Sequence, residues 1–132
     1  MKLMNNIMAG INAVVNNEYL YILFLFIIFD IVTGTLKAFS TNTVYSKINK
    51  KGITIHVTVF LFCIFFSWAF YIFKVTEYTN ILIMFYIVSY GLSIIENVGQ
   101  MGLPLPKWLI DKFHILQDRT NEGVKDETKR IK

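Results

Sequence analysis

The chain has 132 residues, of which 55% are hydrophobic, 16% are aromatic and only 17% are charged. This balance argues against a small soluble domain, because such a domain keeps a polar stripe on each element, whereas here the apolar runs are long and uninterrupted. The formal charge of +4 does not indicate nucleic-acid binding, since the lysines form no dense stripe interleaved with aromatic residues. One cysteine excludes an internal disulfide and any multi-cysteine metal site.

Residues 1–18 predict an amphipathic helix, with apolar side chains on one face and asparagines largely elsewhere. Such a helix fits either the membrane interface or the surface of a neighbouring protomer, and the pattern does not decide between them. The segment lacks a long apolar core followed by a small-residue cleavage pattern. We therefore expect the first membrane-crossing helix to act as its own insertion signal.

Three apolar runs that could cross a bilayer as helices follow, at residues 19–36, 53–73 and 79–95. At about 1.5 Å per residue the first two cover roughly 27 and 30 Å, close to the thickness of the hydrocarbon layer. The third is shorter and ends at Glu96 and Asn97, which favours little tilt, local thinning or a partner at its polar end. The predicted fold is an all-α integral membrane protein with three transmembrane helices.

The charges of the connections predict the orientation. The first loop, KAFSTNTVYSKINKKG, holds four lysines and no acidic residue, while the second connection, residues 74–80, holds one lysine and one glutamate. By the positive-inside rule the first loop faces the cytoplasm, so the amino terminus lies outside and the carboxyl terminus inside. The carboxyl-terminal segment agrees, because it is rich in lysine and arginine.

Residues 97–118 combine a breaker segment, GQMGLPLP, with a last helix that starts at Pro106. This helix carries Trp108 and further apolar residues, and we expect it at the inner membrane interface with Trp108 at headgroup depth. Residues 119–132 mix both charge signs with little apolar content, which predicts a solvated, mobile tail.

Each predicted span has a polar side. A carboxylate at membrane depth costs at least about 2.5 kcal/mol, so Asp30 in the first span needs a partner. The polar and small residues there follow the spacing i, i+3, i+4, i+7, which places them on one side of the helix: Asp30, Thr33, Gly34 and Lys37. Gly34 would allow close packing, and Asp30 would pair with Lys37 or with a second helix.

The other two spans repeat this arrangement. In the second, His56, Cys63 and Ser67 share a side. The third has a polar stripe that widens towards its inner end, formed by Ser89, Ser93, Glu96, Asn97 and Gln100. Three such sides could surround a protein interior or water, but helix packing explains each stripe equally well when it is taken alone.

No pattern predicts a catalytic, cofactor or metal site. A lone histidine such as His56, near a helix start, is more typical of an interfacial residue than of a metal ligand, and no second ligand is spaced to complete a site. The serines of the spans lack a histidine and an acid in triad order, and no glycine-rich phosphate loop is present. We therefore expect a protein that is not an enzyme and needs no cofactor.

The stretches FDIVTGTLKAF, SKINKKGI and YGLSIIENVGQMGLPLP together resemble the toxin-secretion/phage-lysis holin family, of the phage holin family 4 type. The resemblance covers roughly residues 24–110. Its specificity lies in the order and spacing of Asp30, Thr33, Gly34, Lys37, Lys51, Gly52, Ser93, Glu96, Asn97, Gly102, Pro104 and Pro106. One departure is His56, where the resemblance leads us to expect a basic residue.

This resemblance implies a protein that accumulates in the bacterial cytoplasmic membrane and self-associates into a homo-oligomer. At a set time it would open lesions that release a cargo, either a cell-wall hydrolase (an endolysin) or a secreted toxin. The partners implied are the lipid bilayer and further copies of the chain. Two other classes stay open: a small ion channel or transporter component, and a non-conducting membrane adaptor or lysis regulator.

Overall fold

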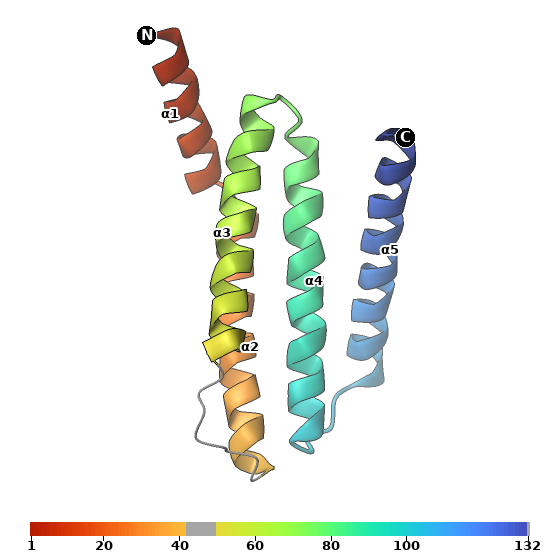
Figure 1. Cartoon of the computed structure of the whole chain (residues 1–132). Coiled ribbons are helices and arrows are strands. Elements are labelled where there is room, and N and C mark those ends of the chain that lie inside the picture. Colours follow the sequence, from red (N-terminus) through yellow and green to blue (C-terminus); the bar gives the residue numbers. More distant parts are fainter. Residues whose placement is uncertain (42–49, 132) are drawn as a thin grey trace.

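The computed structural model describes residues 1–41 and 50–131. Within these ranges the chain forms five helices and no strand: α1 (Lys2–Val15), α2 (Glu18–Ser40), α3 (Lys50–Ile72), α4 (Glu77–Gln100) and α5 (Lys107–Ile131). Helices α2, α3 and α4 run side by side, α1 extends from one end of the bundle, and α5 turns back along α4 (Figure 1). The middle of the lysine-rich first loop, residues 42–49, lies outside the described residues.

Three helices of the described chain are long and apolar enough to cross a membrane, which confirms the predicted all-α fold with three spans. They cover Glu18–Ser40, Gly52–Ile72 and Glu77–Gln100. The first and third helices are longer than the apolar runs that predicted them. Hydropathy falls at Glu96 and Asn97, but neither residue breaks a helix, so α4 continues until the turn at Gly102, where φ is +84°.

Local signals explain where the first span begins. The side chain of Asn17 accepts a hydrogen bond from the backbone N–H of Tyr19 at 2.9 Å, and so caps α2. Glu18 in the first turn and Lys37 in the last turn complement the helix dipole. The amphipathic segment and the first span are therefore two helices that meet at a capped junction.

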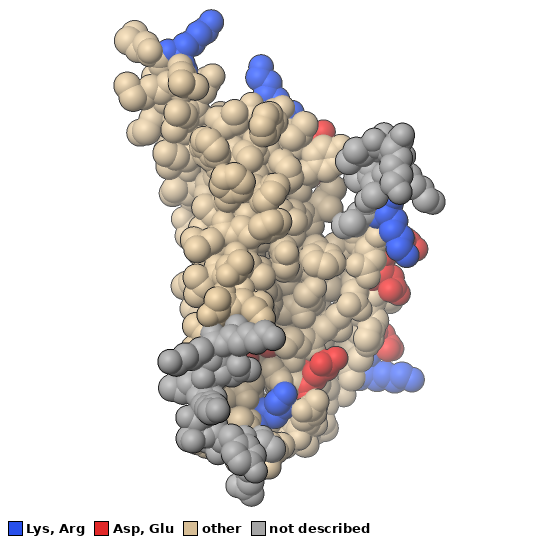
Figure 2. Space-filling view, viewed as in Figure 1, with Lys and Arg blue, Asp and Glu red and all other residues tan. Residues whose placement is uncertain are grey.

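The bundle has a small apolar core and a largely apolar exterior. Leu23, Cys63 and Ile83, one from each spanning helix, are fully buried at 0% exposure. Many large apolar side chains instead point outward, among them Leu25 of α2 and Phe65 of α3. In the face drawn in Figure 2, charged side chains gather towards the ends of the bundle and along α5. An exterior of this kind fits lipid rather than water.

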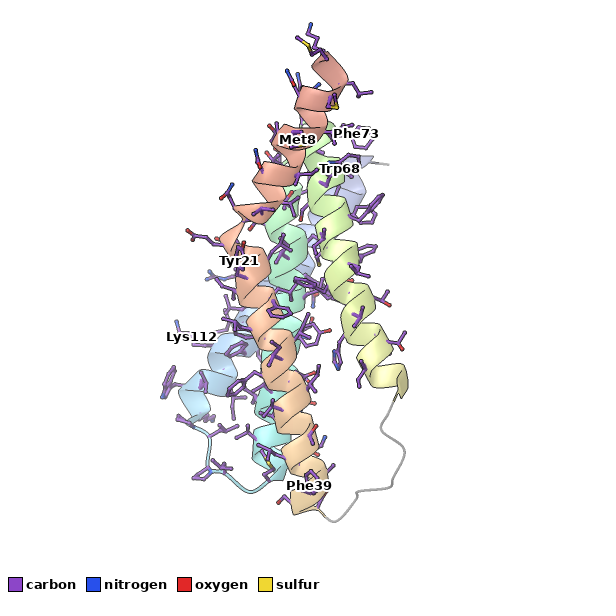
Figure 3. All side chains as sticks on the ribbon, turned by 90° about the vertical axis from the view of Figure 1, so that its left-hand side faces the viewer. Met8, Tyr21, Phe39, Trp68, Phe73 and Lys112 are labelled. Atoms are coloured by element: carbon purple, nitrogen blue, oxygen red, sulfur yellow. The ribbon has the colours of Figure 1, made fainter. Side chains whose placement is uncertain are left out.

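Helix α1 packs against the end of α3 and leaves much of its apolar face exposed, although Val14 packs against the core. A Cβ atom at Gly10 would lie 3.0 Å from Cδ1 of Trp68, so the two helices approach closely there (Figure 3). Leu3, Met4 and Met8 are more than half exposed. The described part of this chain therefore contains no partner that covers these three side chains.

Helix α5 is longer than the sequence predicted. Residues 119–131, where we expected a solvated, mobile tail, are helical. This segment contains no proline, and its many Glu, Lys and Arg residues are good helix formers. The ring of Phe113 sits directly over Gly91 of α4, where any Cβ atom would overlap it. Trp108 is 65% exposed; the interfacial position of this helix stays a prediction.

Candidate functional site

The three spanning helices bring a cluster of polar side chains together inside the bundle, centred on Asp30. This residue is only 8% exposed. Its Oδ1 accepts hydrogen bonds from Ser93 Oγ at 2.6 Å and from Asn97 Nδ2 at 3.2 Å, both on α4. Of the two partners predicted for Asp30, the second helix is the one observed. Lys37 is half-buried and makes no ion pair with Asp30 in the part of the chain that the structure describes.

Thr33 extends the contact between α2 and α4 by one helical turn. Its hydroxyl donates to backbone carbonyls of its own helix and lies 3.4 Å from Nδ2 of Asn97. The Asn97 amide thus bridges Thr33 and the Asp30 carboxylate. A Cβ atom at Gly34 would lie 3.6 Å from the same amide nitrogen, an ordinary van der Waals contact. Close packing of α2 on α4 therefore does not require a glycine at this position.

Helix α3 contributes His56. Its Nε2 lies 3.9 Å from Oδ2 of Asp30, and its Nδ1 lies 3.0 Å from the hydroxyl of Tyr90, where the tautomer decides which atom donates. The imidazole therefore joins the second span to both of the others. Within the cluster, only this imidazole can carry a positive charge opposite the carboxylate. A basic residue at this position would carry that charge permanently.

We define the Asp30 cluster as Asp30, Thr33, His56, Tyr90, Ser93 and Asn97. A buried carboxylate is costly unless charge-stabilising groups surround it, and here neutral donors and an imidazole fill that role. The arrangement is a set of interhelical hydrogen bonds inside an apolar shell. It can hold the three spans in one packing, and it can re-form with other partners or with water if the helices separate.

The remaining predicted residues lie apart from this cluster. Ser67 is buried towards the other end of the bundle and donates to the carbonyl of Cys63 at 2.6 Å. Ser89 donates to the carbonyl of Phe85 in its own helix at 2.8 Å. Glu96 is exposed, whereas Asn97 is buried, so the polar stripe of α4 divides between two faces.

Tyr90 is the member of the Asp30 cluster that its sequence pattern did not predict. It lies three residues before Ser93 and seven before Asn97, so it shares their side of α4. That spacing was visible in the sequence. A tyrosine within an apolar run, however, can equally well pack in the core or face lipid. Only the structure, in which Tyr90 contacts His56, shows that it lies inside the bundle.

Residues 10–118 match the model of the Bacteriophage holin family, a range that includes all three spans and the whole Asp30 cluster. The chain belongs to the bacteriophage holin family. The resemblance seen in the sequence is thereby confirmed. This holin-family protein is a multi-pass membrane protein, and its family is not a class of enzymes.

Curated relatives agree with this assignment. A probable holin of Bacillus phage phi105 is 30% identical over 115 residues, which cover 83% of each chain. An uncharacterised protein of Halalkalibacterium halodurans is 36% identical over 104 residues, or 74% of this chain and 77% of the relative. An uncharacterised protein of Bacillus subtilis is 27% identical over 116 residues, covering 85% of this chain and 81% of the relative. No solved structure matches this holin-family protein significantly.

Proposed function

We propose that this chain assembles into homo-oligomers in the bacterial cytoplasmic membrane and opens lesions that release a cell-wall hydrolase. The observation that carries the proposal is the burial of Asp30 between α2 and α4, in a bundle whose exterior is largely apolar. An ionisable side chain inside a membrane segment is costly, and where it occurs it usually serves a function. A toxin in place of the hydrolase is the alternative cargo.

The Asp30 cluster suggests how one chain could exist in two states. In the closed bundle, the polar groups of α2, α3 and α4 satisfy one another and lipid meets the apolar exterior. In a lesion, the helices separate, and the same polar groups face water at the rim of the opening. Because the change is collective, a small difference in packing free energy is multiplied over many protomers.

Two exposed features support self-association. The first turns of α1 keep their apolar side chains open, with Leu3 73% and Met4 66% exposed. Glu96 is exposed near the end of α4, where no basic residue pairs with it in the described part of the chain. A neighbouring copy would cover the exposed apolar side chains of α1 and provide polar partners for the Glu96 carboxylate. We place the amino terminus outside and the carboxyl terminus in the cytoplasm, following the lysine bias of the first loop.

Inducible expression in bacteria tests the proposal. Membrane potential and release of a cytoplasmic enzyme are followed together after induction. We expect a lag without leakage, then abrupt loss of potential and release of the enzyme. Conductance of ions without release of protein would favour a channel, and inert behaviour would favour an adaptor or lysis regulator. Either result would overturn lesion formation.

A further inference from the structure

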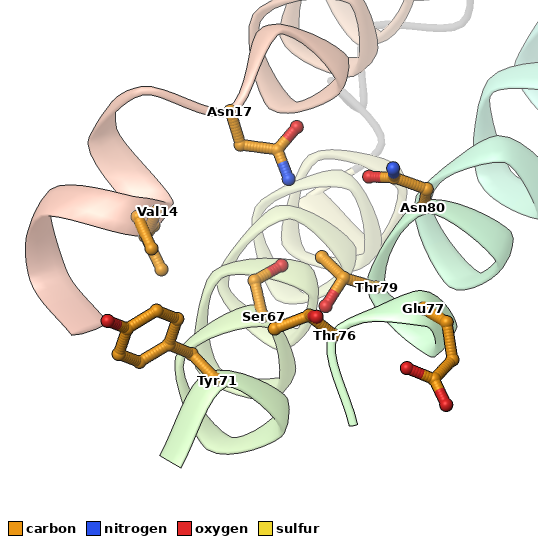
Figure 4. Close-up of a pocket in the computed structure, with 9 residues that line it drawn as sticks. Val14, Asn17, Ser67, Tyr71, Thr76, Glu77, Thr79 and Asn80 are labelled. Carbon is orange, nitrogen blue, oxygen red and sulfur yellow. The ribbon is translucent and has the colours of Figure 1, made fainter. Parts of the chain in front are cut away.

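A second polar region lies at the opposite end of the bundle from the Asp30 cluster. Here the end of α1, the start of α2, the end of α3 and the start of α4 enclose a partly open cavity of about 400 Å³. Figure 4 shows Asn17, Ser67, Thr79 and Asn80 turned towards the same space between the helices. Glu77 also lines this cavity and is exposed.

The cavity contains a buried hydroxyl without a partner. Thr79 is 7% exposed, and its Oγ1 makes no hydrogen bond with any residue that the structure describes. Ser67, on the opposing helix, is 4% exposed and uses its proton on the Cys63 carbonyl, which leaves its lone pairs available. Buried polar groups are normally satisfied by protein or by water, so the unpaired hydroxyl of Thr79 points to a hydrogen-bonding occupant.

The size and lining of the cavity fit water. A water molecule takes about 30 Å³ in the liquid, so the space has room for on the order of ten. Purely apolar cavities stay dry, whereas this one offers hydroxyl and amide groups from α3, from α4 and from Asn17, the residue that caps α2. Its wall therefore suits water and other small hydrogen-bonding molecules better than lipid chains.

An apolar plug closes the inner end of the cavity. Cys63 lies one helical turn from Ser67 on α3, and together with Leu23 and Ile83 it is fully buried. Beyond the plug lies the Asp30 cluster, since His56 is eleven residues from Ser67, or about 16 Å along a helix. The three spans thus hold two polar regions separated by a layer of apolar side chains.

We infer that the cavity is a water-filled vestibule, which opens at the end of the bundle that carries the α3–α4 turn and is closed by Leu23, Cys63 and Ile83. It admits water and small hydrophilic solutes as far as Ser67. It belongs to the single protomer, so it exists before any lesion forms and does not depend on the proposed function.

Thiol accessibility tests the vestibule on the full chain in membrane vesicles of both orientations. Ser67→Cys and Thr79→Cys are made in a Cys63→Ala background and exposed to a small cationic methanethiosulfonate reagent, which the Glu77 carboxylate at the rim would favour. The control is Phe65→Cys in the same background, because Phe65 lies near the depth of Ser67 but is 59% exposed on the outside of the bundle. The unmodified chain, in which Cys63 is the only cysteine, is measured alongside.

We expect both vestibule cysteines to react at least about tenfold faster than Phe65→Cys and Cys63, and from one side of the membrane only, because thiols in lipid do not form the reactive thiolate. Two positions on different helices guard against misfolding of either variant. Rates at both positions no higher than that of Phe65→Cys would overturn the vestibule. Because no lysis is scored, this outcome would leave the proposed function untouched.

The plug is tested separately in the chain that retains Cys63. Leu23→Ala removes a fully buried side chain beside the vestibule, and we expect Cys63 to become reactive from the vestibule side. Leu25→Ala is the matched control, since Leu25 is 63% exposed on the same helix. Equal reactivity of Cys63 in the two variants would overturn the assignment of the plug.

Discussion

The hydroxyl of Ser93 donates a 2.6 Å hydrogen bond to the carboxylate of Asp30, joining the first and third spans across 63 residues of sequence. Ser89, one turn earlier on the same helix, uses its hydroxyl on its own backbone. The two serines look alike in the sequence, and the structure gives them different roles. That difference allows the contribution of the interhelical bond to be measured.

Ser93→Ala should weaken the packing of α2 against α4. Hydrogen bonds to charged groups contribute about 1.5–3 kcal/mol, so we expect a loss of that order in the free energy of unfolding, measured by denaturant titration in micelles. Ser89→Ala should change it by less than about 0.5 kcal/mol, because it removes only a bond within the helix. Equal effects of the two substitutions would contradict the special role of Ser93.

Asp30→Asn should delay permeabilisation without preventing membrane insertion. Asparagine keeps an oxygen that Ser93 can reach, but it removes the buried charge, whose hydration in a lesion would favour opening. The measurement is the time from induction to release of a cytoplasmic enzyme, with the amount of protein in the membrane as the insertion readout. Glu18→Gln, at an exposed position, is the control. Unchanged timing in Asp30→Asn would show that the charge of Asp30 does not contribute to opening.

His56→Phe and Tyr90→Phe should be coupled. The Nδ1 of His56 and the hydroxyl of Tyr90 lie 3.0 Å apart, so each substitution removes the same interhelical hydrogen bond. In a double-mutant cycle in micelles, we expect a coupling free energy of about 0.5–1.5 kcal/mol. Strictly additive effects would show that α3 and α4 are not linked by this pair.

Gly91→Ala should loosen the packing of α5 on α4, because the added methyl group overlaps the ring of Phe113 and the ring must move. We expect faster tryptic cleavage of α5 than in the unmodified protein. Phe113→Ala should reverse this effect in the double variant. Gly99→Ala is the control, since its nearest contact would be an ordinary 3.9 Å. Cleavage that is as fast with Gly99→Ala as with Gly91→Ala would argue against the Gly91–Phe113 contact.

The orientation predicts the accessibility of the first loop. In a Cys63→Ala background, Ser46→Cys should resist an impermeant thiol reagent added to intact cells and should react once the membrane is opened. The reason is the lysine bias of this loop, which favours the cytoplasmic side. Lys74→Cys, in the α3–α4 turn and in the same background, should show the opposite pattern. Labelling of Ser46→Cys from outside would reverse the topology.

The Asp30 cluster was only partly foreseeable. Helical spacing placed Asp30 with Thr33 and Ser93 with Asn97, and the structure brings these two pairs together. Spacing alone did not separate Glu96, which is exposed, from its neighbour Asn97, which is buried. Adjacent residues differ by about 100° around a helix, so which of them points inward depends on how the helices are rotated against each other.

The amino-acid sequence by itself determined that this is a three-span membrane protein, because the free energy of placing a segment in lipid depends mainly on its own length and composition. Only the tertiary structure decided which polar residues meet, that Tyr90 contacts His56, that Ser67 and Thr79 line one cavity, and that α5 packs on Gly91. These contacts join residues far apart in the chain, and they follow from side-chain packing between helices, which no local pattern encodes.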